Sequence, residues 1–159
     1  NLALACALRA GKTSIFWRAM GSLRAVHEAA DAIAERVGLS DVRFETVRRL
    51  SYGTQRQLEV GLALACEPKV LLLDEPTAGM SPEETARMRA LVGNLPAGLT
   101  MVIIEHDMDI VMDIADRIIV LDYGSVLVEG SPAEIRASDV VRQRYLGERA
   151  AAHLSGGAA

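Results

Sequence analysis

The sequence predicts an α/β fold in which helices pack on a mainly parallel sheet. Two short apolar runs, 70–73 and 100–104, have strand length and end at acidic or histidine residues. Buried parallel strands deliver such groups to the carboxyl edge of a sheet. Three serines stand where helix N-caps are expected, at Ser51, Ser81 and Ser131. Strand and helix signals therefore alternate along much of the chain.

Composition narrows the class of protein. The chain has 159 residues, a one-domain length, and 17 Lys+Arg against 21 Asp+Glu give a net charge of -4. A nucleic-acid binder usually carries an excess of positive charge, which this composition lacks. No apolar run reaches the roughly 18 residues of a membrane helix. Cys6 and Cys66 are far apart and match neither a disulfide framework nor a zinc site.

The N-terminal segment contains a sequence that imitates a phosphate-binding loop. A P-loop needs glycine five positions before its Gly-Lys pair, but Cys6 stands five positions before Gly11. The intervening residues include no glycine, so their side chains would obstruct a phosphate. We therefore interpret Gly11, Lys12 and Thr13 as an ordinary loop. The chain starts at Asn1 with no basic segment before its apolar run, so we expect it to begin within a longer protein.

The first helix predicted from periodicity covers 22–37. Its apolar residues recur every three or four positions, and Gly38 ends it. The next helix begins at Ser51, and we expect its inward face to carry Leu58, Leu62 and Ala65 before Pro68 ends it. The free N–H groups at its start, together with the positive end of the helix dipole, form half of a phosphate site.

The run 70–73 is the first predicted strand, and it ends at Asp74 and Glu75. Taken alone, these residues could equally form a solvated acidic turn. Ser81 then starts a helix that reaches about residue 94, with proline first and glutamate third. The second strand, 100–104, places His106 at its end, so parallel pairing would bring Glu75 and His106 to one edge.

The remaining elements are a helix over 107–115, a hairpin and a tail. Strands 117–121 and 125–128 flank the turn at Asp122, Tyr123 and Gly124. Ser131 opens a tail helix within 131–148, and 149–159 has no usable pattern, so we expect disorder there.

Three motifs together resemble those of ATP-binding cassette (ABC) ATPases. Residues 50–55 resemble the signature motif, 71–75 the Walker B motif and 103–108 the switch histidine, in the family's order. The residues of these motifs, together with the segment 145–148 near the C-terminus, are most similar to those of ATP-binding subunits of branched-chain amino-acid importers. The resemblance covers 22–148 and implies part of a P-loop NTPase fold, the C-terminal portion of a cassette without Walker A or Q-loop.

The resemblance implies roles at the sheet edge. Asp74 would hold Mg²⁺ through water, Glu75 would polarise the attacking water, and His106 would contact the γ-phosphate of ATP.

The resemblance also implies a site shared between two cassettes. Signature residues Ser51, Tyr52, Gly53 and Gln55 would contact ATP bound by a second cassette, and Ala78, Gly79 and Ser81 would form a dimer loop. Three positions depart from the family's common pattern: Tyr52 replaces glycine, Thr54 stands where glutamine is common, and Ser81 replaces aspartate.

By resemblance, 1–66 belongs to the helical subdomain, 67–130 to the ATPase core and 131–148 to a C-terminal tail. The expected protein is the ATPase subunit of an ABC importer for branched-chain or related amino acids, peripheral to the cytoplasmic face of the inner membrane. Its partners would be membrane permease subunits and, indirectly, a periplasmic binding protein, with no nucleic acid. The alternatives are a non-transport ABC machine, such as one of DNA repair, and a non-catalytic fragment.

Overall fold

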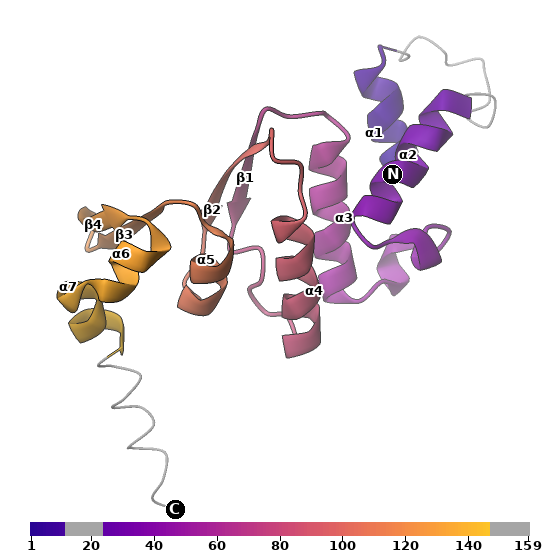
Figure 1. The fold of residues 1–159 in the computed structure, drawn as a ribbon. Coiled ribbons are helices and arrows are strands. Elements are labelled where there is room, and N and C mark those ends of the chain that lie inside the picture. Colours follow the sequence, from indigo (N-terminus) through magenta and orange to yellow (C-terminus); the bar gives the residue numbers. More distant parts are fainter. Residues whose placement is uncertain (12–23, 147–159) are drawn as a thin grey trace, which may run out of the picture. The chain divides into compact units, whose positions relative to one another are not determined.

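The computed structural model describes residues 1–11 and 24–146, which fall into two compact units (Figure 1). Unit 1 ends at His106 and unit 2 begins at Asp107. The loop predicted at Lys12 and Thr13 and the disorder predicted for 149–159 lie outside the described residues. The domain boundaries at 66, 130 and 148 stay predictions, since they refer to a complete cassette.

Unit 1 begins with a helical group made of α1 (Leu2–Arg9), α2 (Arg24–Arg36) and α3 (Tyr52–Leu64). The short 3-10 helices η3 (Ser40–Val42) and η4 (Val47–Arg49) join α2 to α3. Helix α1 packs on α2, and α2 on α3 (Figure 1). Small side chains form the shared core: Cys6, Ala7, Val26, Ala30 and Ala65. Periodicity predicted α2, whereas the almost continuous apolar run of α1 gave no helical pattern and α1 was missed.

Helix α3 begins after Ser51 as predicted, but its predicted inward face is wrong in part. Of the three expected positions only Ala65 is buried, while Leu58 and Leu62 are half-buried. The buried face of α3 consists of Gly53, Gln57, Val60, Gly61 and Leu64. A Cβ at Gly61 would lie 3.2 Å from Val37, so α2 approaches the α3 backbone closely. Close approach at glycines, which hydrophobic periodicity does not register, sets the orientation of this helix.

Strands β1 (Val70–Asp74) and β2 (Thr100–Ile104) pair in parallel, as the sequence predicted, with Val70 opposite Thr100 and Asp74 opposite Ile104. Helix α4 (Pro82–Gly93) connects them and packs on α3. Its N-cap Ser81 forms the predicted capping box with Glu84.

Much of both strands is exposed in this chain. On β1 only Leu71 is buried, and one face of the pair exposes Val70, Leu72, Val102 and Ile104 by 51–72%. The pair forms a two-stranded sheet within the described residues, and these side chains are exposed there. We call these four side chains the open apolar face.

Unit 2 contains α5 (Met108–Ile114), the antiparallel hairpin β3 (Ile118–Asp122) and β4 (Ser125–Gly130), and the helices α6 (Pro132–Ala137) and α7 (Asp139–Val141). A π-helical turn, η5 (Arg142–Leu146), follows. The predicted hairpin turn has φ of 44° at Tyr123 and 78° at Gly124, as a tight two-residue turn requires. The unit's core is Ile118, Val120, Ile135 and Val141.

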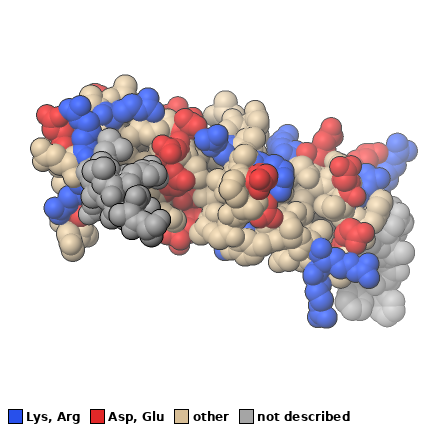
Figure 2. Space-filling model, turned by 90° about the horizontal axis from the view of Figure 1, so that it is seen from below, with Lys and Arg blue, Asp and Glu red and all other residues tan. Residues whose placement is uncertain are grey.

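Both cysteines are free thiols, in agreement with the sequence. Burial raises the pKa of the Cys6 thiol. No helix in 1–11 or 24–146 is long and apolar enough to cross a membrane. Basic and acidic side chains are interspersed on the face shown in Figure 2.

Candidate nucleotide site

The end of β1 turns sharply at Glu75. Its backbone N–H donates to the Ile104 carbonyl at 2.8 Å, which extends the pairing with β2 by one bond. Glu75 has a φ of 43°, in the left-handed region that non-glycine residues seldom occupy. Such a conformation costs on the order of 1 kcal/mol and persists where surrounding bonds fix it. The Glu75 side chain thereby leaves the strand direction and is 51% exposed.

His106 lies at the end of β2 beside this carboxylate. Its Nδ1 atom is 3.5 Å from Glu75 Oε1, and its side chain is 73% exposed. The distance is too long for a strong hydrogen bond, but such contacts often tighten when substrate binds. Parallel pairing therefore brings together the two residues that the sequence placed at separate strand ends.

A buried carboxylate beneath this pair was missed by the sequence reasoning. The Glu105 side chain is fully buried, and its Oε1 accepts from Thr77 N at 3.1 Å and Thr77 Oγ1 at 2.6 Å. Its Oε2 has no hydrogen-bond partner and lies 4.0 Å from His106 Nδ1. Glu105 thus ties the segment after Glu75 to the end of β2. The alternation of β2 was a usable signal, because it points Met101, Ile103 and Glu105 to the same face.

Asp74 is the candidate magnesium ligand. It is exposed at the last position of β1, and among the described residues no group of three or more histidine, cysteine or acidic side chains could hold a metal ion. Mg²⁺ in phosphoryl-transfer sites needs only one or two carboxylates, since substrate phosphates and water complete its octahedron. A single exposed carboxylate at this edge fits that requirement.

Residues 50–55, which resemble the signature motif, form a turn at the start of α3 that we call the signature turn. Hydrogen bonds from its own side chains stabilise it. Ser51 Oγ accepts from Thr54 N at 3.3 Å and lies 2.9 Å from Thr54 Oγ1. Gln55 Nε2 donates to the Leu50 carbonyl at 3.0 Å, and the Tyr52 hydroxyl accepts from Arg56. The unusual Thr54 is therefore part of the cap, and Gln55 braces the residue that precedes the turn.

Glu84, in the first turn of α4, joins the signature turn to the dimer loop. Its Oε1 accepts from Ser51 Oγ at 2.7 Å and Gly53 N at 3.1 Å, while its Oε2 accepts from Ser81 N at 3.1 Å. The sequence predicted only the capping contact with Ser81. The contact with the signature turn spans more than 30 residues of chain, which no local pattern reveals.

The loop predicted to contact a second cassette, at Ala78, Gly79 and Ser81, begins with two tight turns, and we call it the dimer loop. Ala78 N donates to the Glu75 carbonyl at 3.1 Å and Met80 N to the Thr77 carbonyl at 3.2 Å. Gly79 has a φ of 73°, and a Cβ there would lie 3.6 Å from the Tyr52 ring. The loop thus runs beside the signature turn.

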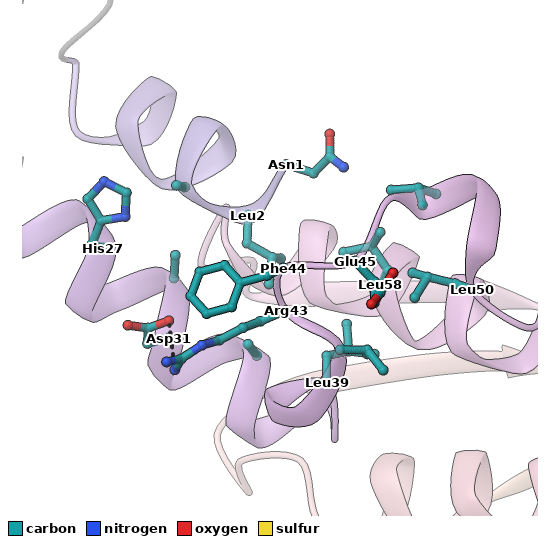
Figure 3. Close-up of a pocket in the computed structure, with 15 residues that line it drawn as sticks. Asn1, Leu2, His27, Asp31, Leu39, Arg43, Phe44, Glu45, Leu50 and Leu58 are labelled. Atoms are coloured by element: carbon teal, nitrogen blue, oxygen red, sulfur yellow. Dashed lines mark ion pairs between the residues drawn. The ribbon is translucent and has the colours of Figure 1, made fainter. Parts of the chain in front are cut away.

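A separate pocket of about 240 Å³ lies in the helical group, between α1, α2 and the segment that leads to α3 (Figure 3). Arg43 forms an ion pair with Asp31 at 3.5 Å and stacks 4.7 Å from the centre of the Phe44 ring. Neither Glu75 nor Ser51 lines this pocket, so it is distinct from the candidate nucleotide site.

The family model described as "ABC transporter" matches residues 7–78. The branched-chain amino acid transport ATP-binding protein LivG of Salmonella typhimurium is 42% identical over 130 residues, which are 79% of this chain and 51% of LivG. The corresponding protein BraF of Pseudomonas aeruginosa is 40% identical over 139 residues, 86% of this chain and 53% of BraF. The chain spans about half the length of these curated relatives.

Solved structures agree with the sequence relatives. An ATP-binding cassette of an ABC transporter has 33% identity and a TM-score of 0.67, covering 76% of this chain and 49% of that one. The ADP conformation of the same cassette has 28% identity and a TM-score of 0.68, covering 92% and 63%. The predicted partial P-loop NTPase fold is confirmed, and the chain belongs to the ATP-binding cassette family of ABC transporters.

Proposed function

We propose that the complete protein is the ATP-hydrolysing subunit of an ABC importer for branched-chain or related amino acids. The observation that carries the proposal is the presence, in one unit, of a braced signature turn and of Glu75 beside His106 at a parallel sheet edge. The names and identity of the LivG and BraF relatives support the importer over a DNA-repair machine and supply the solute class.

In this proposal each side chain has a distinct task. Glu75 accepts a hydrogen bond from the attacking water and orients it, and His106 contacts the γ-phosphate. Glu105 is a positioning residue that holds the segment between Glu75 and the dimer loop through Thr77. Asp74 holds Mg²⁺ through water, and the bound ion would compensate charge on the reacting phosphate.

The signature residues act on the nucleotide of a second cassette. Ser51 Oγ and Gly53 N donate to its γ-phosphate, with Tyr52 and Gln55 shaping the turn. Ala78, Gly79 and Ser81 form the cross-dimer contact. Closure of the two cassettes around ATP, and opening after hydrolysis, would move permease subunits that receive solute from a periplasmic binding protein. The proposed location is peripheral, on the cytoplasmic face of the inner membrane.

Steady-state hydrolysis by a complete cassette containing these residues tests the proposal. Glu75→Gln keeps size but removes the charge that orients water, so turnover should fall by roughly 10² to 10⁴. Glu28→Gln is the matched control, because Glu28 is an exposed carboxylate on α2 that pairs with Arg24 at 2.7 Å. Normal turnover in Glu75→Gln would refute the assigned role.

A further inference from the structure

The Glu84 carboxylate occupies both hydrogen-bond donors that the proposed function assigns to the γ-phosphate. Its Oε1 lies 2.7 Å from Ser51 Oγ and 3.1 Å from Gly53 N. An anion is thus already seated on the signature turn, and it belongs to the same cassette. A phosphate oxygen can approach these two donors only after the carboxylate leaves, since like charges at this distance repel strongly.

Two further observations show how tightly this contact is built. A Cβ at Gly53 would lie 2.7 Å from Glu84 Cδ and 2.8 Å from its Cβ, so only glycine leaves room for the carboxylate. The Ser51 hydroxyl, followed by backbone bonds from Ser81 and Gly53, holds the pKa of Glu84 below its usual range. The group therefore carries its negative charge at neutral pH.

We propose that Glu84 is a latch that blocks the signature donors in the open cassette and is displaced when ATP on a second cassette arrives. This inference rests on the proposed function and deepens it. Oε2 binds Ser81 N independently of the signature turn, so the side chain can release Ser51 and Gly53 while it remains on the helix cap. After phosphate leaves, the carboxylate returns to the donors and favours reopening.

The alternative role for Glu84 is a helix cap alone, and the chain supplies its own comparison. Glu134 forms the same box with Ser131, accepting from Ser131 N at 2.7 Å and Ser131 Oγ at 2.8 Å. The hydrogen bonds of the Glu134 side chain are to Ser131, whereas those of Glu84 reach the signature turn. Making the same substitution at each glutamate in turn therefore distinguishes a general effect on helix capping from an effect on the latch.

The experiment uses a complete cassette in which Glu75→Gln slows hydrolysis and allows an ATP-bound dimer to accumulate. Light scattering gives the ATP concentration for half-maximal dimer. Glutamine also serves at this cap position, so Glu84→Gln removes the charge while keeping the box. We expect Glu84→Gln to lower the ATP concentration for half-maximal dimer roughly five- to tenfold. This is the effect expected when two charge-assisted hydrogen bonds are lost and bonds to water partly replace them. The substitution should also slow dimer dissociation after ATP dilution. Glu134→Gln should change neither quantity.

The outcomes separate the two proposals. An unchanged or higher ATP requirement in Glu84→Gln, with normal dimer formation in the Glu75→Gln parent, would overturn the latch and leave the proposed function standing. A Glu75→Gln parent that never forms an ATP-dependent dimer would contradict the proposed function, and the latch with it. Cooperative thermal unfolding of the Glu84→Gln and Glu134→Gln proteins checks that both fold.

Discussion

Glu105 and Thr77 should be energetically coupled, and a double-mutant cycle measures how strongly. Thr77→Val removes the hydroxyl that donates to Glu105 Oε1 at 2.6 Å, and Glu105→Ala removes the acceptor. A hydroxyl bonded to a carboxylate contributes more than a neutral pair, about 1.5–3 kcal/mol. Because Thr77 is only half-buried, we expect a coupling energy near the lower end, about 1–2 kcal/mol.

Glu105→Ala by itself combines opposing effects. It leaves the Thr77 N–H and hydroxyl without their acceptor, but it also removes Oε2, a buried oxygen that accepts no hydrogen bond. The single variant therefore underestimates the interaction, which is why the cycle is needed.

Urea unfolding of the four proteins in the cycle supplies the free energies, provided that their m-values agree. Thr100→Val is the control, since Thr100 begins β2 and lies far along the strand from Glu105. Its coupling with Glu105→Ala should stay below about 0.5 kcal/mol. A Thr77 coupling as small as that of the control would refute the bracing role of Glu105.

Three other outcomes are expected of the 159-residue chain itself. Leu72→Lys should reduce self-association in light scattering while changing the free energy of unfolding by less than about 0.5 kcal/mol, because Leu72 is 72% exposed on the open apolar face. ATPase activity should be negligible and unchanged by Lys12→Ala; hydrolysis lost in that variant would identify a genuine P-loop. The pKa of Glu134 is lowered by hydrogen bonds from Ser131, so the unfolded state binds protons first as the pH falls. The contribution of these hydrogen bonds to the free energy of unfolding should be present above pH about 4.3 and be lost as the pH falls below it. Ser131→Ala should make the free energy of unfolding, measured with urea, depend less on pH in this range.

The elements that the sequence predicted well are those with explicit end signals. Strand 100–104 was placed at its observed bounds, and the capping boxes at Ser81 and Ser131 located α4 and α6. Serine, proline and glutamate at fixed offsets satisfy backbone donors locally, so these signals do not depend on the rest of the fold.

The features that were missed depend on contacts distant in sequence. The buried face of α3 follows the close approach of α2 to Gly61, and the bonds of Glu105 and Glu84 span 28 to 33 residues. A glutamate is most often a solvated side chain, so nothing in the sequence marks Glu84 as more than a helix cap, and for Glu105 the alternation of β2 was the only usable signal. The groups that each carboxylate bonds became visible when the structure placed helix and strand ends side by side.

The central claim is that the signature turn of one cassette and the Glu75 edge of a second cassette together form one ATP site. Light scattering of a complete cassette, with and without ATP and Mg²⁺, tests it directly. Glu75→Gln should form an ATP-dependent dimer, and adding Ser51→Arg should abolish that dimer while each cassette still binds ATP. A Glu75→Gln/Ser51→Arg protein that dimerises with ATP as readily as Glu75→Gln alone would contradict the claim.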